Sequence, residues 1–121
     1  MIPSHLEWFH INTIKKICKK QGIDFVVVII PDELQINQDL LREIKASSPN
    51  RESDKWDITL PNRILSNELD KLGIDNIDLY KYFAGASSQE RYKPRNTHWN
   101  IAGNELAADV IEKHIQKYLE D

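Results

Sequence analysis

The sequence is poor in the residues that build cross-linked or membrane-spanning chains. Its 121 residues include one cysteine, one methionine and four glycines. A single cysteine excludes an internal disulfide and a cysteine-based zinc cluster. The apolar run at residues 25–30 has the length of a strand, and no run approaches the roughly 18 residues of a membrane span. The first five residues also lack the basic start and apolar stretch of a signal peptide.

An excess of positive charge is absent as well. Lys and Arg number 16 against 19 Asp and Glu, so the formal net charge is −3. This balance argues against nucleic acid or an anionic membrane as the main partner. A composition of 40% hydrophobic and 29% charged residues is typical of a folded chain. We therefore expect residues 1–121 to form a single domain or one part of a larger domain.

Apolar spacing predicts helices alternating with strands. The expected helices span residues 5–21, 38–45, 61–72 and 100–119, and the expected strands span residues 25–30 and 74–79, with a less regular strand at 58–60. The polar stretch 46–57 indicates a loop. Gly22 and Gly73 follow helices, where glycine commonly ends them. The alternation predicts an α/β fold with a parallel sheet.

The first expected strand indicates an incomplete sheet. Residues 25–30 form a continuous, mostly β-branched run, which is typical of a strand buried on both faces with a neighbour on each side. Sheets of this kind usually carry about five strands. We therefore expect strands to be missing, supplied either by an absent N-terminal half of the domain or by a dimer partner.

His98 is the first candidate for chemistry. It ends an irregular loop directly before the last expected helix, where Asn100 is a suitable N-cap. A positioned imidazole is the commonest general base in enzymes. The alternative is a structural loop histidine that stacks on Trp99.

Residues 98–108, from His98-Trp99-Asn100 through Gly103, resemble the last sequence block of SGNH (GDSL-type) ester hydrolases. The branch that they resemble is related to polysaccharide O-acetyltransferases. The preceding elements also occur in the same order as in that family: the valine-rich strand, the glycine-ended helix at 61–72 and the short strand at 74–79. The resemblance implies a three-layer, flavodoxin-like α/β/α fold, of which this chain is the C-terminal part.

The resemblance also implies a Ser-His-Asp site that acts on an ester or acyl group without a metal or organic cofactor. His98 matches the general base, which takes the serine proton and returns it to the leaving alcohol. Trp99 matches the residue packed beside it at the substrate. Gly103 matches the position that lets the helix start lie close to its neighbours.

Two departures from the family pattern bear on catalysis. The Gly-Asp-Ser block of the nucleophile is absent, and none of the serines has its strand-to-helix context: Ser4, Ser47, Ser48, Ser53, Ser66, Ser87 and Ser88. The family acid, two or three residues before the histidine, is replaced by Asn96 and Arg95. Asn96 can orient the imidazole but cannot stabilise its cation. Asp78 is an alternative acid, or a helix cap.

These residues predict the C-terminal segment of an SGNH-type ester hydrolase or O-acyltransferase. Its substrate would be an acylated carbohydrate or similar ester, and its placement by resemblance would be extracytoplasmic. The alternative is a non-catalytic SGNH-like binding or assembly module. A third hypothesis is an unrelated flavodoxin-like domain with a structural His98.

Other candidates favour structural roles. His5 and His10 are five residues apart, off the spacing that shares a helix face, so a metal site there is not expected. Cys18 falls on an apolar helix side, and His114 falls among charged residues, which predicts a solvated surface. The segment Pro31-Asp32-Glu33 follows a strand, so it either lines the crevice of His98 or forms a turn and cap.

Overall fold

The computed structural model describes residues 5–47, 55–85 and 88–120. Its elements are α1 (His5–Gln21), β1 (Val26–Ile29), α2 (Glu33–Ile36), α3 (Gln38–Ala46), α4 (Leu60–Lys71), β2 (Asp75–Asp78), α5 (Tyr80–Phe83), α6 (Ser88–Arg91) and α7 (Ile101–Leu119). None of the described helices combines the length and apolar character needed to cross a membrane. Most of the expected loop at 46–57 lies outside the described residues, at 48–54.

The two strands form a parallel sheet. β1 pairs with β2 in register from Val26 opposite Asp75 to Ile29 opposite Asp78. The predicted α/β class with a parallel sheet is confirmed. Within the described residues, the other edge of β1 has no partner strand.

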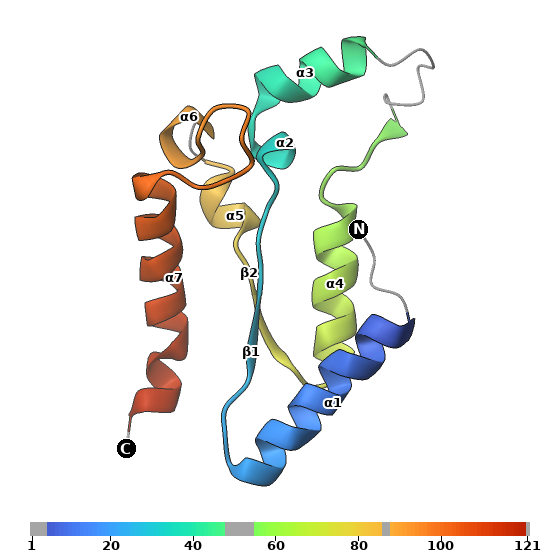
Figure 1. The fold of residues 1–121 in the computed structure, drawn as a ribbon, viewed down its shortest axis with the longest axis vertical. Coiled ribbons are helices and arrows are strands. Elements are labelled where there is room, and N and C mark those ends of the chain that lie inside the picture. Colours follow the sequence, from blue (N-terminus) through green and yellow to red (C-terminus); the bar gives the residue numbers. More distant parts are fainter. Residues whose placement is uncertain (1–4, 48–54, 86–87, 121) are drawn as a thin grey trace.

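The side chains of β1 alternate between two helical layers. Val26 and Val28 join an apolar cluster formed with α5 and α7, whereas Val27 and Ile29 join a second cluster formed with α1 and α4. Figure 1 accordingly shows α7 on one side of the strands and α1 with α4 on the other. Each fully buried aliphatic side chain contributes about 1.5–3 kcal/mol, so the sheet is held from both faces.

Two helices, α1 and α4, end just before a glycine. Gly22 and Gly73 have φ angles of +68° and +69°, a left-handed conformation that glycine adopts without a Cβ clash. The following amides donate back into the last turns, from Ile23 to the Cys18 carbonyl at 2.8 Å and from Ile74 to the Leu69 carbonyl at 2.9 Å. Each turn directs the chain into the strand that follows, as the glycine pattern predicts.

The strand predicted at residues 58–60 is wrong. Residues 58 and 59 form a turn and Leu60 begins α4, because Pro61 suits the first turn of a helix and supplies no N–H to a sheet. The short helices α2 and α6, of four residues each, were not predicted, and α5 (Tyr80–Phe83) was foreseen only as the segment that Asp78 could cap. One turn is too short to display a helical apolar period.

Candidate active site

His98 lies in the loop between α6 and α7. The loop is closed at its base by an isolated antiparallel bridge between Tyr92 and Trp99. The Lys93 amide donates to the His98 carbonyl at 2.8 Å, and the Asn100 amide donates to the Arg91 carbonyl at 2.9 Å. Residues 93–98 therefore form a short loop whose two ends are held together by these hydrogen bonds.

The start of α7 fixes one side of that base. The Asn100 side-chain oxygen accepts the Gly103 amide at 2.8 Å, which confirms the predicted N-cap. A Cβ on Gly103 would lie 2.1 Å from the Arg91 carbonyl oxygen, so this contact requires glycine. The prediction that Gly103 lets the helix start approach its neighbours is confirmed.

Aromatic side chains support the loop from below. Trp99 is half-buried and stacks on Phe83 with ring centroids 5.5 Å apart at 24°. Tyr92 meets Phe83 edge-on at 5.9 Å, and its hydroxyl donates to the Pro31 carbonyl, two residues beyond the end of β1. Burial raises the pKa of the Tyr92 phenol, so it stays a neutral donor. The loop base is thereby tied to the sheet.

The His98 ring bonds through one nitrogen. Its Nδ1 lies 2.6 Å from Asn96 Oδ1 and 2.9 Å from the Asn96 carbonyl oxygen. Both oxygens are acceptors, so Nδ1 carries the proton and Nε2 keeps a lone pair. Among the described residues Nε2 has no hydrogen-bond partner. This is the tautomer that a general base requires, on an exposed side chain.

A cavity of about 350 Å³ adjoins the imidazole. Its lining combines apolar and polar side chains: Ile30, Lys93, Thr97, His98, Trp99 and Asn104. The site lies beyond the carboxyl ends of β1 and β2, where open α/β sheets bind ligands. Trp99 lines this cavity in addition to packing on Phe83.

The loop conformation depends on Glu33, for which sequence reasoning left two roles open. The side chain is buried, with 1% exposed, and accepts the backbone amides of Arg95 at 3.0 Å and of Asn96 and Thr97 at 3.1 Å. Arg95 and Thr97 have φ angles of +55° and +62°, each of which costs about 1–3 kcal/mol. Asp32 meanwhile caps α2, so the Pro-Asp-Glu segment both forms a cap and reaches the histidine loop.

The alternative acid does not reach His98. Asp78 Oδ1 accepts the Tyr80 amide at 3.0 Å and the Asn62 side-chain amide at 3.1 Å, so it bonds to the first residue of α5, whose N-cap is Leu79. Of the serines with described side chains, Ser47 donates to the Ile44 carbonyl and Ser66 donates to Asn76. Ser4, Ser48, Ser53 and Ser87 lie outside the described residues, and Ser88 begins α6.

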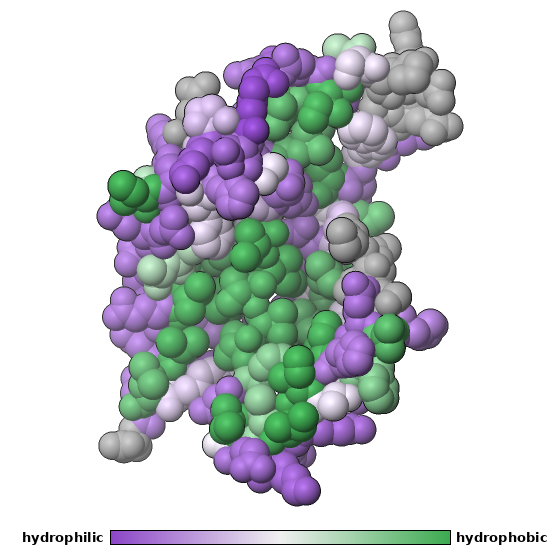
Figure 2. Space-filling model, viewed as in Figure 1, coloured by the Kyte–Doolittle hydropathy of each residue, from purple (hydrophilic) through white to green (hydrophobic). Residues whose placement is uncertain are grey.

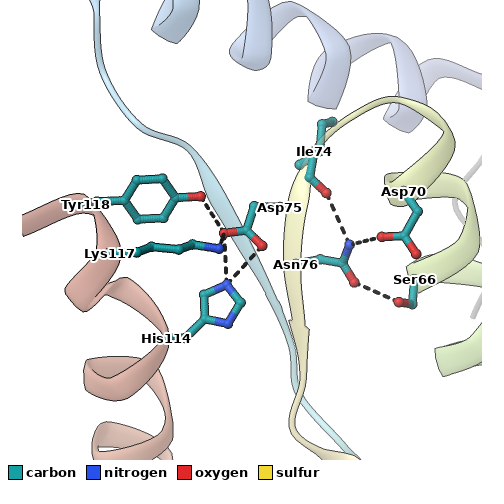
Figure 3. A network of polar contacts seen from close by, with 8 residues as sticks. All are labelled: Ser66, Asp70, Ile74, Asp75, Asn76, His114, Lys117 and Tyr118. Carbon is teal, nitrogen blue, oxygen red and sulfur yellow. Dashed lines mark hydrogen bonds and ion pairs between the residues drawn. The ribbon is translucent and has the colours of Figure 1, made fainter.

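The prediction that His114 lies on a solvated surface is wrong. Its Nε2 lies 2.9 and 2.8 Å from the two carboxylate oxygens of Asp75, at the amino end of β2 (Figure 3). Tyr118 donates to the same carboxylate at 2.5 Å, and Lys117 pairs with it at 3.1 Å. Burial raises the pKa of Asp75, but the hydrogen bonds from Tyr118, His114 and Lys117 outweigh it and lower the pKa to about 2.

His5 and His10 both lie on α1. Within residues 5–47, 55–85 and 88–120, the structure places no three His, Cys, Asp or Glu side chains together in a way that could hold a metal ion.

Comparison with protein families finds a match over most of the chain. Residues 5–121 match the model of an SGNH hydrolase-like domain, described for the acetyltransferase AlgX. The chain belongs to this family. The SGNH-like, acyltransferase-related class and its α/β fold are thus shown for nearly the whole chain. Neither a curated protein nor a solved structure matches the chain.

Proposed function

We propose that this SGNH-like chain carries the general-base histidine of a serine acyl-transfer site that acts on an acylated carbohydrate or similar ester. The supporting observation is the hydrogen bonding of His98: Nδ1–H is held by Asn96, and Nε2 is left free beside a cavity of about 350 Å³. Because the matching family is described for an acetyltransferase, acetyl is the acyl group that we propose.

The proposed reaction uses His98 twice. Nε2 takes the hydroxyl proton as a serine oxygen attacks the acyl carbonyl, and the imidazolium returns that proton to the leaving alcohol as the carbonyl–oxygen bond breaks. Water or an acceptor hydroxyl then releases the acyl group by the reverse route. The nucleophile and the oxyanion donors come from polypeptide outside these 121 residues, which contain no Gly-Asp-Ser block.

The open edge of β1 is the proposed place for that polypeptide. β1 is covered on both faces yet pairs with one strand among the described residues. Figure 2 shows apolar surface running along the line of β1 in Figure 1, and large apolar side chains are exposed nearby in sequence: Ile14, Ile17, Ile23 and Ile30, each at least 45% exposed. A parallel strand with flanking helices from the nucleophile-bearing half satisfies both the unpaired edge and this surface.

The test uses the complete native protein and a fluorophosphonate probe, with intact mass as the readout. The proposal is supported if the protein with an intact His98 forms a single adduct and if the rate of adduct formation falls about 10²–10⁴-fold in His98→Ala. His10→Ala, an exposed histidine of α1, is the matched control. A native mass near 14.1 kDa without an adduct contradicts it.

A second candidate function rests on Asn96. A neutral amide beside His98 cannot stabilise an imidazolium, which favours a binding or assembly module that keeps the SGNH fold without its chemistry. In that case the complete protein binds its carbohydrate equally well with His98→Ala, and neither form reacts with the probe. Equilibrium binding measured beside probe labelling separates the two functions.

A further inference from the structure

Glu33 is a buried carboxylate without a cationic partner. Its side chain is 1% exposed, and among the described residues it forms no ion pair; the guanidinium of nearby Arg95 pairs with Glu43 instead. Burying a carboxylate is costly unless hydrogen bonds compensate it. The compensation here comes from three consecutive backbone amides, those of Arg95, Asn96 and Thr97.

The backbone of that segment has the shape of an anion-binding nest. Positive φ angles at Arg95 and Thr97, on either side of Asn96, turn successive N–H groups toward one point. Neither Arg95 nor the β-branched Thr97 favours this conformation on its own. The carboxylate and the strained turn therefore depend on each other.

Glu33 is itself rigidly placed. It is the first residue of α2, separated from the end of β1 by residues 30–32, and Asp32 caps that turn by accepting the Leu34 amide at 2.8 Å. Gln35 closes the cap on the Asp32 amide at 2.8 Å and donates to Asn62 of α4 at 2.7 Å. The Glu33 carboxylate thus holds the loop of His98 in a fixed position relative to the sheet.

We propose that Glu33 is the positioning residue of this site: its carboxylate clamps residues 95–97 so that Asn96 reaches His98 Nδ1 and fixes the tautomer. Asn96 is held from both sides, since its amide donates to Glu33 while its two oxygens accept from His98. The catalytic meaning of the clamp rests on the proposed function, whereas the clamp itself does not.

The test compares Glu33→Gln with Glu43→Gln in the complete native protein, using NMR. Glu43→Gln removes the same charge and contacts the same loop, but only through the exposed side chain of Arg95. In Glu33→Gln we expect amide exchange at residues 95–97 to rise about tenfold or more, because a hydrogen bond to a charged acceptor is lost. We also expect the imidazole ¹⁵N shifts of His98 to change from one tautomer to a mixture. Glu43→Gln leaves both readouts as in the unmodified chain.

Unchanged exchange and an unchanged His98 tautomer in a folded Glu33→Gln chain overturn the clamp. Should Glu33→Gln unfold, a further variant decides. Adding Thr97→Gly relieves the positive φ and restores folding and tautomer at least in part if the clamp is real. A double variant of Glu33→Gln and Thr97→Gly that stays unfolded overturns the proposal.

The clamp and the proposed function fail in different ways. A tautomer that changes in Glu33→Gln, with no probe labelling of the complete protein in any form, keeps the clamp and removes the acyl-transfer chemistry. Labelling that depends on His98 but is unaltered by Glu33→Gln, with an unaltered tautomer, keeps the chemistry and removes the clamp.

Discussion

The molecule holds two histidines that each bond to a neighbouring side chain, at opposite ends of the sheet. His98 pairs with the neutral Asn96 in an exposed loop beyond the carboxyl ends of the strands, whereas His114 pairs with the carboxylate of Asp75 at the amino end of β2. By residue type alone, His114 and Asp75 are the better catalytic pair. Their surroundings reverse that ranking.

The surroundings differ in what remains available for chemistry. Asp75 also binds Tyr118 and Lys117, and its side chain is 24% exposed, so the cluster ties the last turns of α7 to β2 (Figure 3). His98 uses only Nδ1 and keeps Nε2 free next to a cavity. A histidine–carboxylate pair is therefore structural here, and the position of the imidazole relative to the strand ends carries the functional argument.

The largest expected effect comes from giving His98 a carboxylate partner, as His114 has in Asp75. Asn96→Asp places a carboxylate 2.6 Å from His98 Nδ1 in place of an amide oxygen. Because the reverse change in a serine triad costs about 10⁴ in rate, we expect probe labelling of the complete protein to accelerate by up to about that factor. No acceleration in a folded variant favours the non-catalytic module.

The next effect tests how rigidly the His98 end is built. In Gly103→Ala the new Cβ would lie 2.1 Å from the Arg91 carbonyl oxygen, so we expect a loss of about 3 kcal/mol in the free energy of unfolding, measured by urea denaturation. Gly22→Ala is the matched control, because Gly22 lies before the amino end of β1, at the opposite end of the sheet from His98. There no atom lies within 4 Å, and the φ of +68° alone costs about 1 kcal/mol. Equal losses would contradict this difference.

The smallest effect concerns the Asp75 cluster. A pKa lowered from 3.8 to about 2 stabilises the folded state above the unfolded pKa by about 2 kcal/mol. That contribution is lost as the pH falls from about 4 through the folded pKa near 2. Asp75→Asn should therefore remove it at pH 7 and flatten the acid side of the stability curve, as followed by thermal melting. An acid limb of the stability curve that stays equally steep in Asp75→Asn would show that the Tyr118, His114 and Lys117 contacts do not lower the Asp75 pKa.

Much of the fold was predictable because it depends on local patterns. Apolar spacing predicted both ends of α1, α3, α4 and α7 to within one residue, and glycines marked the ends of α1 and α4. Asn100 was predictable for the same reason, since N-capping depends on a few adjacent residues. The role of Gly103 was implied only by the family resemblance, because its close contact is with the distant Arg91 carbonyl. The one-turn helices lack such a pattern, and the strand expected at 58–60 was overridden by Pro61.

The sequence by itself determined the family, the α/β class, the general position of His98 and the neutral residue two positions before it. Only the tertiary structure decided what Glu33 and His114 do. Glu33 is separated from Arg95 by 62 residues, and His114 from Asp75 by 39. Hydrogen bonds between such distant positions leave no local pattern, because they form only when packing of the helices on the sheet brings the two segments together.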